Sequence, residues 1–312
     1  MPAPVMQRSN FSDLFGSSQL PVLEYLFRSE LDRHPSRREM LFNTRQTDRD
    51  IWQYSEIHDL DLFSEVSEGT EFSFKRPKQG ANKTLTMTKF GLGFSISEEM
   101  VSDGKFDFIA DSVRKLGKSA RESQEISAMN IFNNGFSTET TADGVSVFNT
   151  AHTLPSGLTF RNRLSTNADL SVTSLDTALQ DFETQFIGDS GIKYSISPKF
   201  LVVHPSNKRF AMELVGSTLK PETADNNMNA FLQDNLMVVS SPHLTDSDAW
   251  FLTSSPDNLD ENGLVIVVRE GIQTTAAGPD VGFTTDSIFY KAKYREKLAA
   301  VHPYGLFGSP GA

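Results

Sequence analysis

The feature that most constrains this chain is a pair of alternating segments that cannot bury their own apolar side chains. Residues 71–75 alternate Glu, Phe, Ser, Phe and Lys, a polar stretch follows at 76–80, and residues 84–97 alternate again. This pattern predicts a long β-hairpin with an exposed tip. Because an isolated two-stranded hairpin is marginally stable in water, and its second strand has large apolar residues on both faces, the hairpin must lie on another surface.

The second predicted strand changes face partway along its length. Leu85 and Met87 occupy odd positions, whereas the apolar residues from Phe90 onward occupy even positions. Since side chains alternate in a strand, this change predicts a bulge or bend near Lys89. We expect four side chains of the hairpin to dock on an adjacent copy and not in the chain's own core: Phe72, Phe74, Leu85 and Met87.

A long helix and a closing strand flank the rest of the chain. Apolar residues recur at three- and four-residue spacing from residue 106, and Asn133, Asn134 and Gly135 supply a stop. A helix of about 27 residues is about 40 Å long. At the other end, Tyr290, Ala292 and Tyr294 alternate with Lys291, Lys293 and Arg295. We expect one strand there, with an apolar face and a basic face.

Composition divides the chain into parts. Residues 1–45 are rich in Ser, Pro and Arg, with one amphipathic stretch at 20–31, and we interpret them as an arm outside the core. On that interpretation the subunit folds without residues 1–40. Residues 172–261 contain 13 acidic and five basic residues, most of the net charge of −11. Such an island predicts an inserted domain, with its two flanks meeting in a second domain.

The acidic island has a mixed α/β pattern. Its expected elements are a helix over residues 175–186, a buried strand at 200–203, a helix capped by Ser206 and running to Val215, a surface loop at 216–235, and strands near 249–252 and 264–268.

Composition also excludes several classes of chemistry. The absence of cysteine removes disulfides, thiolate nucleophiles and Cys-ligated metals, and fits a reducing compartment. The net charge of −11 gives no overall attraction to nucleic acid or anionic lipid. The longest aliphatic run, residues 264–268, is far too short to span a membrane, and the first residues lack the apolar stretch of a secretory signal. We expect a soluble, intracellular, globular protein with no membrane partner.

The catalytic candidates are two phrases that echo trypsin-like proteases. They are Thr150, Ala151 and His152, and the Gly-Asp-Ser-Gly run at 188–191. A triad needs a serine, a histidine and a buried carboxylate. However, 38 residues separate His152 from Ser190, too few for the barrel that should lie between them, and Gly188 closes a predicted helix. We predict no enzyme, and a serine hydrolase using His152 and Ser190 stays open as an alternative.

Other motifs are incomplete. Gly91 and Gly93 lie inside a strand and lack the third glycine of a dinucleotide fingerprint. Asn258, Asp260 and Asn262 resemble the start of a calcium loop, but Arg269 stands where that loop carries Glu. The histidines are scattered, there is no P-loop, and the basic strand face fits a solvated surface better than phosphate contacts. We therefore predict no catalytic, cofactor-binding or metal site, and no cofactor.

The order of these elements resembles the major capsid proteins of tailed phages, whose fold is named after phage Hong Kong 97. Residues 147–154, Val-Phe-Asn-Thr-Ala-His-Thr-Leu, are similar to the "F-x-T-x-H" stretch of Mu-like phage head proteins. The resemblance spans residues 20–305 and implies an α+β fold. It implies an N-terminal arm, an extended E-loop hairpin that reaches over neighbouring subunits, a P-domain with a long spine helix, and an inserted α/β A-domain.

The resemblance also implies a division of the chain. The segments are 1–45 for the N-terminal arm, 46–100 for the E-loop hairpin and flanking strands, 101–171 for the P-domain spine helix and strands, 172–275 for the axial A-domain, and 276–312 for the return to the P-domain. No long helical scaffolding segment precedes the arm, so we expect a separate or already removed scaffold. No motif supports covalent cross-links.

The resemblance implies a structural major capsid protein that self-assembles through pentamers and hexamers into an icosahedral shell around phage DNA. The implied partners are further copies, scaffold, portal and cement proteins, and packaged double-stranded DNA in non-specific contact. The implied location is the virion, assembled in the host bacterial cytoplasm. An alternative with the same fold is an encapsulin-like nanocompartment shell that carries an enzyme cargo.

Overall fold

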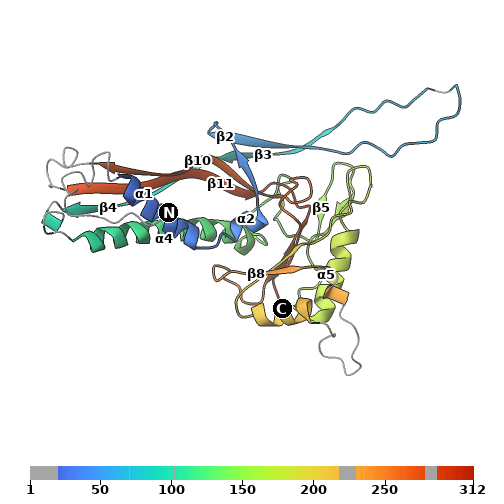
Figure 1. The fold of residues 1–312 in the computed structure, drawn as a ribbon. Coiled ribbons are helices and arrows are strands. Elements are labelled where there is room, and N and C mark those ends of the chain that lie inside the picture. The colour runs from blue at the N-terminus through green and yellow to red at the C-terminus, as the bar shows by residue number, and fades with distance from the viewer. Residues whose placement is uncertain are drawn as a thin grey trace.

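The computed structural model describes residues 20–69, 71–97, 99–100, 103, 105–217, 230–232, 234–277 and 287–312. Figure 1 shows a long sheet covered by helices, a second sheet beside it, and a hairpin that projects away from both. Most of the loop expected at 216–235 lies outside the described residues. The projecting hairpin is the feature that the rest of the fold positions.

The long sheet is built around two antiparallel strands of 14 residues each. They are β10 (Leu264–Ala277) and β11 (Ser287–Ala300). β1 (Asn43–Gln46) pairs with β10 in parallel, and β4 (Thr88–Ser97) pairs with β11 and forms the other edge. The predicted apolar face of β11 is confirmed, because Tyr290, Ala292 and Tyr294 are all buried.

The helix α4 (Phe106–Asn133) covers that apolar face, as Figure 1 shows. It has 28 residues and ends at the predicted stop, where the Asn134 N–H donates to the carbonyl of Asn130. Ile109 and Val113 are fully buried and belong to the same apolar cluster as Tyr290. The long helix predicted from the apolar spacing is therefore confirmed.

The first described helix, α1 (Leu20–Arg33), corrects the interpretation of the N-terminal region as lying outside the core. Leu23 and Phe27 are buried in the cluster that α4 and β11 share. The next helix, α2 (Arg38–Leu41), is held by Arg38, whose guanidinium donates to both oxygens of Glu296 at 2.8 and 2.9 Å. Residues 20–41 are thus core elements, and removing residues 1–40 would open the core.

The second sheet has the order β12 (Leu306–Ser309), β9 (Trp250–Thr253), β7 (Phe200–Val203) and β8 (Met237–Ser240). β7 spans the predicted residues, and all four of its side chains are buried. Part of the return segment therefore pairs with the inserted strands, while β10 crosses the boundary expected at residue 275. The division into named domains stays a prediction.

Helices accompany this second sheet. α5 (Val172–Thr184) starts with a capping box made by Ser171 and Ser174, and a short 3-10 turn covers Ala230–Leu232. α6 (Lys208–Gly216) follows Asn207, and neither Asn207 nor Ser206 caps it with a side chain. Ser206 instead hydrogen-bonds His204 at 2.8 Å, so the predicted Ser206 cap is wrong.

The hairpin pairs different strands from those predicted. β2 (Ile51–Ile57) runs antiparallel to β3 (Gln79–Thr86), whereas residues 71–75 form no strand. The bend expected near Lys89 is confirmed, since β3 ends at Thr86 and β4 starts at Thr88 in a different sheet. The chain therefore turns out of the hairpin into the long sheet at this point.

The expected docking of Leu85 and Met87 on an adjacent copy is wrong. Their side chains are only 3% and 8% exposed within the protomer itself. They pack in one cluster with Val265 and Val267 of β10, with Ala299 at the end of β11, and with Val301, which follows that strand. We call β2, β3 and the adjoining Met87 the hairpin root. Leu85 and Met87 make this root part of the protomer's own core.

Candidate assembly surfaces

His152 serves as a structural clamp. It lies in β5 (His152–Thr153), which pairs with β6 (Thr159–Phe160), and its ring is buried. Nδ1 lies 2.6 Å from an oxygen of Asp143, and Nε2 lies 3.1 Å from Oδ1 of Asn162. The Asn162 amide donates in turn to the carbonyl of Val147 at 2.7 Å. Both ring nitrogens therefore already face acceptors and are not free to activate a nucleophile.

The charge of Asp143 is stabilised by this clamp. Burial by itself would raise the pKa of Asp143. Hydrogen bonds from His152, Thr141 and the Val145 N–H outweigh burial and hold the pKa below its ordinary value. The carboxylate thus stays ionised and fixes the loop between α4 and β5.

Ser190 lies in a different part of the molecule. It lines a shallow hollow with Asp59 and Asp189, whereas His152 lines another with Glu56 and His302. The Ser190 hydroxyl is buried and has no hydrogen-bond partner among the described residues. The structure therefore does not bring the two residues of the hydrolase alternative together.

The remaining sequence candidates also take structural roles. The Asn262 amide donates to the carbonyls of Leu41 and Ser254, and its oxygen accepts from the Leu264 N–H, so the calcium-like stretch is a fixed turn. Among the residues that can be placed, no three His, Asp or Glu side chains form a group that could hold a metal ion. No helix within the described ranges has the length and apolarity needed to cross a bilayer.

Lys83 ties the root of the hairpin to the protomer. Its ammonium group donates to the carbonyls of Thr140 and of Ala300, the latter at 3.0 Å, and lies 3.4 Å from Glu139. Burial lowers the pKa of Lys83, although Glu139 opposes the shift. This partly buried cation joins β3 to the loop after α4 and to the end of β11.

A second set of contacts holds the chain just beyond the strands. The Tyr194 hydroxyl donates to Asp59, and Lys78 lies 3.8 Å from Asp189. Asp189 is itself held by the Ser156 N–H at 2.7 Å. Both limbs of the hairpin are therefore fastened where they leave the body of the molecule.

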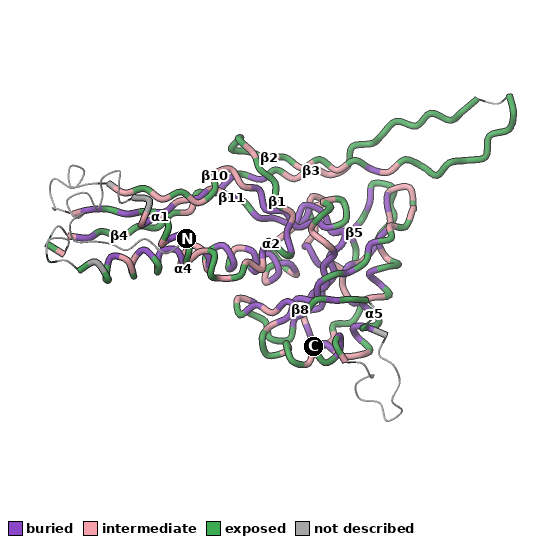
Figure 2. Tube along the Cα trace, viewed as in Figure 1, coloured by how far each residue is buried: buried purple, intermediate pink, exposed green. Residues whose placement is uncertain are grey.

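Beyond these contacts the hairpin is fully solvated. We call residues 58–69 and 71–78 the hairpin end; no strand is assigned in it, and Figure 2 shows it exposed along almost all of its length. Phe72 is 72% exposed and Phe74 is 92% exposed. The other large apolar side chains exposed there are Leu60, Leu62, Phe63 and Val66. Five carboxylates and no lysine or arginine lie between Asp59 and Phe74.

The sequence interpretation placed the tip at residues 76–80 and missed how long this end is. The signal for the true first strand was present, because residues 51–57 alternate Ile, Trp, Gln, Tyr, Ser, Glu and Ile. Its partly buried residues are Trp52, Tyr54 and Glu56, and Trp52 stands opposite Leu85 in the register. The predicted exposure of a tip is confirmed, but the exposed segment is longer than residues 76–80.

Comparison with known proteins identifies relatives of this arrangement. The family model for phage capsid proteins matches residues 81–308. No curated protein matches the chain. The capsid structure of the cyanophage P-SCSP1u has a TM-score of 0.62 with 11% identity, covering 89% of this chain and 88% of its own.

Two further solved structures share the fold. The mature capsid of bacteriophage PhiM1 has a TM-score of 0.55 with 12% identity, covering 88% of this chain and 87% of its own. A virus-like particle from Pyrococcus furiosus also has a TM-score of 0.55 with 12% identity, covering 92% and 97%. At these identities the structural likeness shows the fold alone.

Proposed function

The chain belongs to the phage capsid protein family, and on that premise we propose that it assembles through pentamers and hexamers into a closed shell around double-stranded DNA. Its fold is the α+β fold of the Hong Kong 97 type, and it is a structural shell protein of the virion. Such shells use heterologous contacts that close by curvature. We further propose that the chain has no enzymatic activity.

The observation that carries this proposal is the hairpin end. A monomer that stayed free in solution would expose the rings of Phe63, Phe72 and Phe74 on a projecting segment. Burying one such ring on a partner contributes about 2 kcal/mol. Contiguous exposed apolar side chains mark interaction sites. Contact with further copies explains both the projection of the hairpin end and its apolar content.

The remaining partners follow from the family and from charge. We propose that a separate scaffold guides assembly in the host cytoplasm, that a portal and cement proteins join the shell, and that the chain touches DNA without reading its sequence. The net charge of −11 supports weak contact with DNA. An encapsulin-like shell is a second candidate, supported by the likeness to the archaeal virus-like particle.

Sedimentation combined with electron microscopy of the purified chain tests the proposal. We expect closed particles built of pentamers and hexamers, formed by the chain alone or with its scaffold. Nuclease-protected DNA inside particles from infected cells supports the phage shell, whereas a folded enzyme cargo without DNA supports the nanocompartment. Monomers or dimers alone, with scaffold present and over a range of salt, would contradict both.

A further inference from the structure

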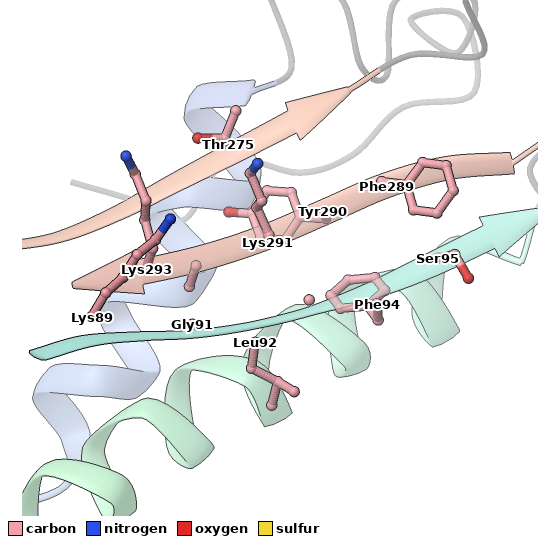
Figure 3. A pocket seen from close by; sticks show the side chains of 12 residues that line it. Lys89, Gly91, Leu92, Phe94, Ser95, Thr275, Phe289, Tyr290, Lys291 and Lys293 are labelled. Atoms are coloured by element: carbon pink, nitrogen blue, oxygen red, sulfur yellow. The ribbon is translucent and has the colours of Figure 1, made fainter. Parts of the chain in front are cut away.

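Ionisable side chains of this protein line two different kinds of hollow. Figure 3 shows Lys89, Lys291 and Lys293 around a hollow of about 770 Å³ on an open face of the long sheet, where water can solvate their charges. A second hollow, of about 220 Å³, lies against the hairpin root and has buried ionisable groups in its wall. His152 is one of these groups and is 1% exposed. A charge in that position needs partners from the protein itself.

The side-chain amide of Asn162 has one orientation that satisfies its neighbours. Its nitrogen donates to the carbonyls of Val147 and Pro303 at 2.7 and 3.4 Å. Its oxygen accepts from the Asn149 N–H at 2.8 Å. Exchanging the two amide atoms would place an oxygen against two carbonyls and an NH₂ group against an N–H. The oxygen is therefore an acceptor, and Nε2 of His152, 3.1 Å away, must carry a proton.

The other ring nitrogen of His152 faces an ionised carboxylate. Nδ1 lies 2.6 Å from an oxygen of Asp143, which also accepts from the Thr141 hydroxyl and from the Val145 N–H. Burial acts to raise the pKa of Asp143, but these three hydrogen bonds hold it below its ordinary value. An ionised carboxylate can only accept hydrogen bonds. Nδ1 must therefore carry a proton as well.

The local sequence brings this histidine into place. The side-chain oxygen of Asn149 accepts from the Ala151 N–H at 3.1 Å, a turn typical of asparagine. The next residue, His152, then enters β5, which pairs with β6. Phe160 of β6 stacks on its ring, with centroids 5.3 Å apart, and the face of an aromatic ring attracts a cation at that distance. The stretch 147–154 thus supports one buried charge.

The remaining ionisable groups in the wall come from two other segments. Glu56 and His58 lie on the hairpin side, and His302 and Tyr304 follow β11. Burial lowers the pKa of His302 to about 4 and raises that of Tyr304, so both rings are uncharged near pH 7. Burial also raises the pKa of Glu56, although His58 opposes this shift. The two rings that follow β11 therefore do not repel a positive charge on His152.

We propose that His152 is a buried imidazolium whose two N–H groups fasten the loop after α4 to β12. The proton on Nδ1 holds Asp143 of that loop. The proton on Nε2 holds Asn162, whose backbone carbonyl accepts from the Gly308 N–H of β12 at 3.0 Å. The ligand of this site is a proton, and its loss leaves one acceptor without a donor. Alkaline solution should therefore loosen the loop and β12 together.

Nitrogen-15 NMR of the ring measures the two protons directly. We would label the full-length protein with ¹⁵N-histidine and assign the His152 signals by their absence in His152→Gln. At pH 7.5 we expect both nitrogens to show the shifts and one-bond proton couplings of N–H groups, whereas a free histidine standard is mostly neutral at that pH. A His152 ring with only one protonated nitrogen would overturn the proposal.

Asp143→Asn tests the charge partner, because asparagine keeps the size of the side chain and removes its charge. At pH 7.5 the ratio of doubly to singly protonated His152 should fall at least about tenfold, the factor given by about 1.4 kcal/mol of lost attraction. Asp189→Asn is the matched control. Asp189 accepts from the Ser156 N–H in another hollow, so this variant should leave the His152 signals unchanged. An unchanged ratio in folded Asp143→Asn would contradict the proposal.

Amide exchange tests whether the proton couples the two segments. In Asp143→Asn, exchange should accelerate at least about fivefold in residues 143–149 and in residues 303–308, while residues 109–120 of α4 stay constant. Acceleration in the loop alone would show that His152 does not hold β12. Should Asp143→Asn fail to fold, the unaltered chain compared at pH 7 and pH 9.5, corrected for intrinsic exchange, gives the same decision.

Discussion

The root and the end of the hairpin belong to the same continuous segment but have opposite environments. At the root, Leu85 and Met87 are 3% and 8% exposed, and the partly buried Lys83 donates to two carbonyls. At the end, Phe74 is 92% exposed. Both regions alternate apolar and polar residues. The difference shows that alternation marks a face to be covered, and that the covering surface can be the protomer or another copy.

The largest expected effect comes from aspartate substitutions made at the hairpin root and, in a separate variant, at the hairpin end. Leu85→Asp with Met87→Asp should prevent the monomer from folding, because each unpaired buried charge costs several kcal/mol and total stability is about 5–15 kcal/mol. Phe72→Asp with Phe74→Asp should shift the melting temperature by no more than about 2 °C and block assembly. Calorimetry and particle yield separate the two. A native-like melting curve from the first pair would show that the root is not core.

The N-terminal helix provides the next largest effect. Phe27→Ala should destabilise the protomer by about 3–5 kcal/mol, because Phe27 is 1% exposed and fills the cluster under α4. Tyr25→Ala on the same helix should cost under about 1 kcal/mol, since Tyr25 is half exposed. Urea unfolding of both variants measures the difference. Equal, small losses of stability in both variants would show that this helix belongs to an arm outside the core.

Acidification should destabilise the hairpin root before it affects the hairpin end. Burial lowers the pKa of His302 to about 4, and its ring packs beside Tyr54 of β2. In the unfolded chain the His302 ring binds a proton near pH 6.5, whereas in the folded chain it does so only near pH 4. The free energy of unfolding should therefore fall as the pH drops from about 6.5 toward 4. The slope is up to about 1.4 kcal/mol per pH unit.

Denaturant unfolding between pH 7.5 and 5 measures that slope. His302→Gln should flatten it, whereas His204→Gln, beside the second sheet, should leave it unchanged. An unchanged slope in His302→Gln would show that the ring titrates equally in both states.

The smallest effect concerns the point where root and end meet. Tyr194→Phe removes the hydroxyl that donates to Asp59, which should cost about 1 kcal/mol locally. Amide exchange of residues 58–60 should then accelerate about fivefold, while exchange in β3 stays constant. Equal acceleration in both segments would mean that the hairpin opens as one unit and has no separate end.

The periodic elements could be predicted from the sequence because their signals are local. The spacing of Ile109, Val113 and Leu116 specifies one buried stripe on α4. The alternation of β11 specifies which face meets that helix, and the uniformly apolar β7 indicates burial on both sides. The break between β3 and β4 follows in the same way from the change of parity after Met87.

Only the tertiary structure decided which strands pair and which surface covers the apolar face of each strand. Residues 51–57 and 71–75 both alternate, and only the first pairs with β3, because its partly buried Trp52 and Tyr54 complete the cluster around Leu85. Phe72 and Phe74 have no such neighbours in the part of the protomer that the structure describes, and they are exposed to solvent. Periodicity specifies which side of a strand is apolar. Which surface covers that side depends on packing between residues distant in the chain, such as the cluster that contains Leu85 and Val267. Local spacing contains no information about such packing.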